Sequence, residues 1–140
     1  MLSAAGYKTG IFGKWHLGDT AGRYPTDQGF DEWYGIANSS DQAFWADSDS
    51  FQADAGVQLP RIMTALRDQK PQQKEVFDRA KRSTIDREIT DHAIDFIRRR
   101  AEADEPFFAY VPYTQTHEPV DAHPDFKGKT GNGSFADVLA

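Results

Sequence analysis

One lysine and two histidines of this sequence could together bind a tetrahedral oxyanion. Lys14 and His16 directly follow a short segment with strand character, and His117 lies a few residues past a second such segment. Lysine supplies a positive point charge, and histidine supplies directional hydrogen bonds and proton transfer near neutral pH. Spacing alone does not single them out, because a lysine or histidine in a loop is usually solvated. His92 and His123 keep that simpler interpretation.

Two apolar segments are predicted to be the strands that position these side chains. The first covers residues 7–13. The second covers residues 106–112, and its nearly continuous apolar character is typical of a strand buried on both faces of a parallel sheet. Ligands of open parallel sheets bind at the carboxyl ends of the strands. If the two strands are parallel, Lys14, His16 and His117 should meet at one edge, with Lys14 and His16 on the same face of an extended chain.

Helices and turns account for much of the remaining sequence. A helix is predicted over residues 83–100, where five apolar residues recur at helical spacing and Ser83 with Asp86 resembles a capping box. A shorter helix is predicted over residues 61–67. Residues 14–35 contain several glycines and are expected to form turns.

The order of these elements predicts the fold class. Strand, loop, helix and strand in succession indicate an α/β layer architecture. Two predicted strands are too few for a complete doubly wound sheet, and helical turns are expected at both ends of the chain, at residues 2–5 and 135–140. We therefore expect a partial fold, a mostly parallel sheet flanked by helices, truncated at both ends. Residues 37–60 match no pattern firmly.

The composition excludes several classes of function. The chain has 140 residues, enough for one domain, and a net charge of −6, which argues against a nucleic-acid binder with a basic face. It contains no cysteine, so it holds no disulfide, thiolate nucleophile or cysteine-ligated zinc. A run of about 18 apolar residues is absent, so no membrane span is expected. A signal-peptide pattern is also absent, and neither the compartment nor the oligomeric state follows from these residues.

Several motifs of the chain occur together in one known family. The first group is Gly6-Tyr7-x-Thr9, then GKWHLG at residues 13–18, then Pro25-x-x-x-Gly29-Phe30-Asp31. Further groups are residues 106–110, Thr116-His117-Glu118-Pro119, residues 126–129 and residues 133–137. This combination resembles the sulfatase family, the arylsulfatase branch of the alkaline-phosphatase-like superfamily. The resemblance implies a single partial catalytic domain over residues 1–140, with a variable insertion region over residues 37–82.

The resemblance also implies roles for the three candidate side chains. By this likeness, Lys14 contacts the sulfate and a formylglycine nucleophile, and His16 hydrogen-bonds the hydrated aldehyde and helps to collapse the sulfated intermediate. His117 contacts the sulfate near the leaving oxygen, so Lys14 and His117 are also the expected substrate-binding residues. The implied parent enzyme hydrolyses sulfate monoesters of a small molecule or glycan, with Ca²⁺ and formylglycine as cofactors.

The chain departs from the family pattern in two ways. The Cys/Ser-x-Pro-x-Arg motif of the nucleophile and the acidic pairs that hold calcium in the family have no counterpart in it. Nucleophile and metal carry most of such a rate, so we expect the isolated chain to be inactive. No metal ligand is assigned, and Asp47 and Asp49, which are spaced as in a calcium loop, are interpreted as a solvated acidic loop.

Two alternatives remain open at this point. The chain could be a non-catalytic anion-binding or structural remnant, or part of a phosphonate or phosphodiester hydrolase of the same superfamily. The Trp-His-Leu-Gly version of the motif favours a sulfatase over the latter.

Overall fold

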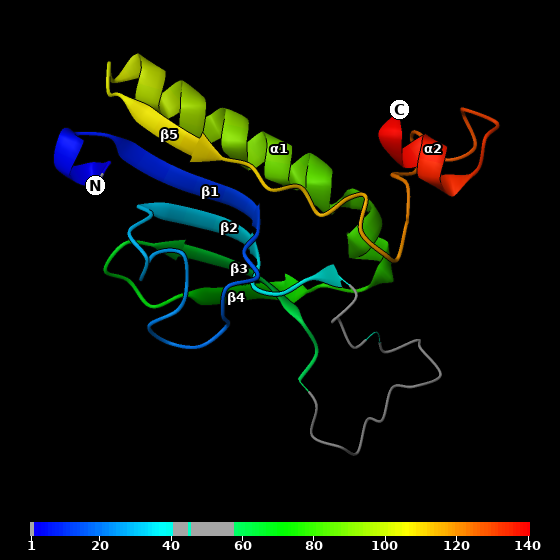
Figure 1. The fold of residues 1–140 in the computed structure, drawn as a ribbon, viewed down its shortest axis with the longest axis horizontal. Coiled ribbons are helices and arrows are strands. Elements are labelled where there is room, and N and C mark those ends of the chain that lie inside the picture. The colour runs from blue at the N-terminus through cyan, green and yellow to red at the C-terminus, as the bar shows by residue number, and fades with distance from the viewer. Residues whose placement is uncertain (1, 41–44, 46–57) are drawn as a thin grey trace.

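A mixed sheet forms the centre of this computed structural model, in which residues 2–40, 45 and 58–140 are described. Within those residues the sheet has five strands in the order β4-β3-β2-β1-β5 (Figure 1). The strands are β1 (Lys8–Lys14), β2 (Glu32–Ile36), β3 (Arg61–Leu66), β4 (Gln72–Val76) and β5 (Phe107–Tyr110). β1 is parallel to both of its neighbours, β2 and β5, whereas β2–β3 and β3–β4 are antiparallel pairs. The predicted α/β layers and parallel β1–β5 pair are confirmed, within a sheet that is mixed rather than mostly parallel.

A long helix, α1 (Arg79–Glu102), covers one face of this sheet (Figure 1). Four residues of the predicted apolar face are buried, Ile85, Ile89, Ala93 and Phe96, whereas the fifth, Ile97, is 38% exposed. The helix begins earlier than predicted, because the Asp78 carboxylate caps it by accepting a hydrogen bond from the Lys81 amide. The predicted capping box is therefore wrong, and the Ser83 hydroxyl instead donates to the Ala80 carbonyl inside the helix.

Two apolar clusters pack against the two faces of the sheet. Successive strand residues point to opposite faces, so Ile11 and Trp33 enter one cluster while Phe12 and Tyr34 enter the other. The cluster with Phe12 and Tyr34 is closed by α1. The opposite cluster is covered by side chains from the segment 15–31, which connects β1 to β2. β1 and β2 are consequently buried on both faces.

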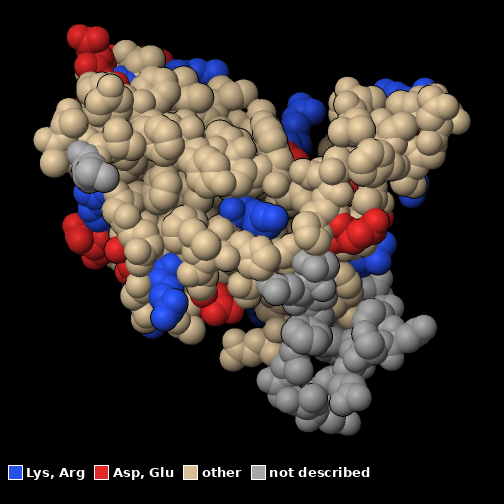
Figure 2. Space-filling view, in the orientation of Figure 1, with Lys and Arg blue, Asp and Glu red and all other residues tan. Residues whose placement is uncertain are grey.

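β5 differs from its prediction because it lies at the edge of the described sheet. Phe107 and Ala109 pack toward the cluster under α1, whereas Phe108 and Tyr110 remain 41% and 47% exposed. The expectation of burial on both faces is thus wrong for this strand and applies to β1 instead. Figure 2 shows that residues other than Lys, Arg, Asp and Glu make up most of the face seen in Figure 1, with one basic group near its centre and further charged groups around it.

Two segments form strands that their own sequences did not predict. Residues 61–66 form β3 and not the predicted helix, because they pair with β2 and bury Ile62, Met63 and Ala65. The predicted turn-rich stretch 14–35 ends in β2.

Both predicted terminal helical turns are present, as η1 (Ser3–Ala5), which ends at Gly6 with φ 85°, and as α2 (Ser134–Leu139). No helix in the described parts of the chain is long and apolar enough to cross a membrane. Asp47, Asp49 and most of the unassigned stretch 37–60 lie outside the described residues, although β3 and β4 fall within the region 37–82 that was predicted to be variable.

Candidate active site

The carboxyl ends of three parallel strands meet at one edge of the sheet. β1 lies between β2 and β5 and is parallel to both, so the segments that follow these three strands leave the sheet at the same end (Figure 1). Backbone hydrogen bonds join the three exits: Lys14 N to Pro112 O at 2.9 Å, Trp15 N to Ile36 O at 2.9 Å and His16 N to Ala37 O at 2.8 Å. This is the edge at which parallel sheets bind ligands, and the sequence had placed its candidate residues there.

Two glycines allow the three strands to approach closely at this edge. A Cβ at Gly13 would lie 2.0 Å from the Pro112 carbonyl oxygen, and one at Gly35 would lie 2.0 Å from the Gly13 carbonyl oxygen. Both glycines also have positive φ angles, 134° and 150°, which side-chain-bearing residues rarely adopt. The first glycine of GKWHLG, Gly13, therefore has a structural role: it lets β1 lie close to β2 and to the segment after β5 at the level of Lys14.

The backbone changes direction within the motif itself. Lys14 is the last residue of β1 and is half-buried, whereas His16 is exposed and has a φ of 59°. The extended alternation that was expected to align Lys14 with His16 thus ends at His16. Between them, the Trp15 indole donates to the Arg23 carbonyl at 2.8 Å and meets the Phe30 ring edge-on, which fixes the segment that follows.

Asp31, the last residue of the Pro25-x-x-x-Gly29-Phe30-Asp31 motif, anchors the other end of the sheet, where β1 and β2 begin. The Asp31 carboxylate accepts hydrogen bonds from the Thr9 amide at 2.7 Å and the Thr9 hydroxyl at 3.0 Å, at the start of β1. It also pairs with the Arg67 guanidinium at 3.1 Å, just past β3. Asp31 is consequently a structural residue that ties the beginnings of β1 and β2 to the end of β3.

His117 lies on the loop that continues β5. It is exposed, its Nδ1 lies 3.2 Å from the Glu118 carbonyl oxygen, and its own carbonyl accepts a hydrogen bond from Arg82 of α1 at 2.7 Å. The structure thus places Lys14, His16 and His117 on chain segments that leave adjacent strands at one edge. Backbone contacts join the Lys14 and Pro112 segments directly, and His117 follows five residues beyond Pro112.

Comparison with known proteins assigns the family. The model of the sulfatase family matches residues 1–137. The chain belongs to the sulfatase family. It is 30% identical over 139 residues to N-acetylgalactosamine-6-sulfatase of Canis lupus familiaris and 29% identical over 150 residues to arylsulfatase A of Homo sapiens, with 99% of the chain aligned in each case. It spans 26% and 28% of the lengths of these two relatives.

A solved sulfatase structure shares the fold of the chain. PsFucS1 sulfatase from Pseudoalteromonas sp. superposes with a TM-score of 0.89 at 23% sequence identity, over 99% of this chain and 30% of that one. This likeness confirms the predicted fold class, that of a partial sulfatase domain.

A buried serine pair at the end of β2 was missed by sequence reasoning. Ser39 and Ser40 are 3% and 0% exposed, and neither hydroxyl has a hydrogen-bond partner among the described residues. A buried polar group without a partner is costly, so such groups tend to mark sites with a role beyond packing. β2 was not predicted as a strand, and applying the strand-end rule to it would have pointed to these residues.

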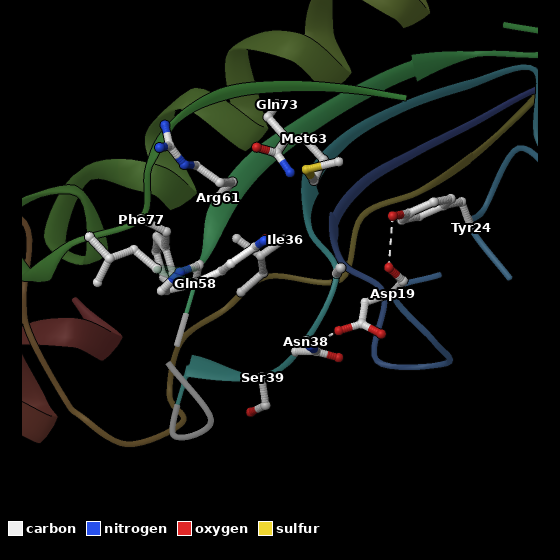
Figure 3. A pocket seen from close by; sticks show the side chains of 13 residues that line it. Asp19, Tyr24, Ile36, Asn38, Ser39, Gln58, Arg61, Met63, Gln73 and Phe77 are labelled. Atoms are coloured by element: carbon white, nitrogen blue, oxygen red, sulfur yellow. Dashed lines mark hydrogen bonds between the residues drawn. The ribbon is translucent and has the colours of Figure 1, made fainter. Parts of the chain in front are cut away.

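Ser39 also lines a pocket of about 270 Å³ at this end of β2. Figure 3 shows Asp19 and Asn38 on one side of the pocket and Arg61 and Gln73 on another. Asn38 donates to the Asp19 carboxylate at 2.9 Å, and the Tyr24 hydroxyl donates to the Asp19 carbonyl at 2.7 Å. Because Asp19 directly follows GKWHLG in the chain, these bonds attach the end of that motif to the β2 exit.

The described residues do not fit the calcium ion that the family resemblance implies. No group of three His, Asp or Glu side chains suited to a metal ion occurs within residues 2–40, 45 and 58–140. The chain also lacks the Cys/Ser-x-Pro-x-Arg motif in which the family forms its formylglycine. What the structure contains at this edge is a set of cationic and hydrogen-bonding groups.

Proposed function

We propose that this chain forms the lysine–histidine side of a sulfatase active site, in which Lys14, His16 and His117 act on a bound sulfate ester. Convergence of the β1, β2 and β5 exits at one edge is the observation that carries this proposal. The family assignment supports it, because the motif with Lys14 and His16 lies inside the matched region together with His117.

The chemistry of these side chains suits sulfate ester cleavage. Negative charge develops on the sulfuryl and leaving-group oxygens as the ester bond breaks, and fixed donors and cations stabilise that charge. Lys14, held at the end of β1, supplies a cation for the sulfate. His117 supplies a donor on the β5 side, and the imidazole of His16 is of the kind that serves as a general acid or base.

We infer that the parent protein hydrolyses sulfate monoesters of a small molecule or glycan. The name of the canine relative, N-acetylgalactosamine-6-sulfatase, supports a sulfated sugar as the substrate class. The isolated 140 residues lack the nucleophile motif, so they should show no turnover of an aryl sulfate with added calcium. Robust turnover that Lys14→Ala abolishes would contradict this expectation of inactivity.

Sulfate titration of the ¹⁵N-labelled chain by NMR tests the binding proposal directly. We expect shifts confined to Lys14, His16, His117 and their neighbours, with sodium chloride at matched ionic strength as the control. Absence of such shifts would refute retained anion binding and leave a structural remnant. Equal binding of sulfate and methylphosphonate would favour the phosphonate or phosphodiester alternative.

A further inference from the structure

The loop that carries His117 is held by a buried arginine of α1. Arg82 is 1% exposed, although it belongs to the first turns of the helix. Its guanidinium donates to four acceptors of the loop: Thr114 Oγ1 at 2.7 Å, Thr114 O at 3.2 Å, Gln115 Oε1 at 2.9 Å and His117 O at 2.7 Å. One side chain therefore contacts three of the four residues from Thr114 to His117, including the backbone of the histidine itself.

A second α1 residue holds the same loop from one turn further along. Asp86 follows Arg82 by four positions, which places both on one face of the helix. Its carboxylate accepts hydrogen bonds from Thr114 N at 2.8 Å, Thr114 Oγ1 at 2.9 Å and Gln115 N at 2.9 Å. The Thr114 hydroxyl joins the two, because it accepts from Arg82 and donates to Asp86.

Packing of α1 on the sheet does not require these polar groups. Ile85, Ile89, Ala93 and Phe96 make that contact. Burying a guanidinium is unfavourable unless it is paired and fully hydrogen-bonded. Burial lowers the pKa of Arg82, and the nearby Asp86 carboxylate opposes this change. An arginine nevertheless keeps its charge in proteins, so this buried cation is held in place by the loop acceptors that it bonds and by the nearby Asp86 carboxylate.

We propose that Arg82 and Asp86 are positioning residues that fix the His117 backbone, and through it the imidazole, on the loop that leaves β5 at the same end of the sheet as Lys14. This role rests on the proposed function, because it matters for the reaction only if His117 contacts the sulfate. The two residues act through the loop, in the way that outer hydrogen-bond partners orient the groups that touch a ligand.

The experiment compares variants of the 140-residue chain by NMR, with and without sodium sulfate. Arg82→Gln removes the charge and most of the N–H donors. Arg82→Lys keeps the charge but lacks the planar set of guanidinium donors. Asp86→Asn removes the negative charge and one acceptor oxygen. Arg99→Gln is the control: it removes a cation of the same helix that pairs with Glu32 and Asp95, away from the loop.

We expect Arg82→Gln and Asp86→Asn to shift and broaden the amide signals of residues 114–117 and the ring signals of His117. Sulfate affinity should fall by roughly 10- to 100-fold, the range for loss of a supporting hydrogen-bond partner. Arg82→Lys should recover part of that affinity, and Arg99→Gln should match the unmodified chain in both readouts. If Arg82→Gln does not fold, the Arg82→Lys and Asp86→Asn variants decide the question.

The two readouts separate failure of this inference from failure of the proposed function. Unchanged sulfate affinity in Arg82→Lys and Asp86→Asn, with the unmodified chain binding sulfate, would overturn the positioning role. If the unmodified chain binds no sulfate, the proposed function fails. The NMR signals of residues 114–117 then test by themselves whether Arg82 and Asp86 hold the loop. Signals of residues 114–117 that equal those of the Arg99→Gln control would then overturn the inference, and selective changes would support the positioning of His117.

Discussion

Replacing Gly13 by alanine should selectively damage the site edge of the sheet. The added Cβ would lie 2.0 Å from the Pro112 carbonyl oxygen, whereas ordinary contacts begin at 3.4 Å. That carbonyl would have to move by about 1.4 Å, and it is also the acceptor for the Lys14 amide. The substitution therefore separates β1 from the chain after β5 at the level of Lys14.

The cost follows from two contributions. An alanine at a φ of 134° is strained by about 1–3 kcal/mol. Loss of the Lys14–Pro112 hydrogen bond adds about 0.5–1.5 kcal/mol. We expect Gly13→Ala to lower the free energy of unfolding by about 1.5–4.5 kcal/mol, a large share of the stability of a small domain. Gly22→Ala is the matched control, because Gly22 has a φ of 84° but open space around it and should lose only about 1 kcal/mol.

Urea unfolding followed by tryptophan fluorescence measures both values, since Trp33 of β2 is fully buried and Trp15, directly after β1, packs against the same apolar cluster. Linear extrapolation gives the free energies, and an unchanged slope would show that the native and unfolded states stay comparable. Equal losses in Gly13→Ala and Gly22→Ala would refute the reasoning, because backbone strain alone would then account for both.

Three further predictions concern separate parts of the chain. Hydrogen bonds from the Thr130 side chain and from nearby backbone amides hold the pKa of Asp137 below its usual value. Its stabilisation is therefore complete above about pH 4 and is lost as pH falls through the folded pKa. Asp137→Asn should flatten the acid side of a pH–stability curve, and an unchanged acid side would contradict this. Asp78→Ala removes the cap of α1 and should cost about 1 kcal/mol by urea unfolding. Tyr110→Lys places a charge on the exposed face of the edge strand β5, and light scattering should show less self-association than in the unmodified chain.

Local pattern was sufficient for β1, β5 and α1, and insufficient for the remaining strands. The apolar residues of α1 recur at helical spacing, so the helix can be recognised from its own sequence. β2 contains a glycine at a position where the neighbouring chain approaches closely, and β4 is the polar sequence Gln72–Val76. Such segments become strands because a partner pairs with them, as β3 does with both β2 and β4.

The residues of the candidate site also fall into those that local sequence could suggest and those that it could not. Lys14 and His117 could be proposed from the sequence because Lys14 ends one recognisable strand and His117 lies on the loop that follows another. Ser39 could not, because β2 was not recognised. Arg82 belongs to a cationic stretch that would ordinarily be assigned to a solvated helix surface, and its contacts with Thr114 span 32 positions of the chain. Only the folded structure brings those two segments together.

The contact between α1 and the His117 loop changes how related chains should be compared. Motifs in loops attract attention because they carry the reactive groups, and helices are commonly treated as scaffolding that tolerates exchange. Here an arginine and an aspartate four positions apart, in a helix well before the histidine, hydrogen-bond the loop that carries it. A relative with the histidine but without this pair would need another means of holding its loop.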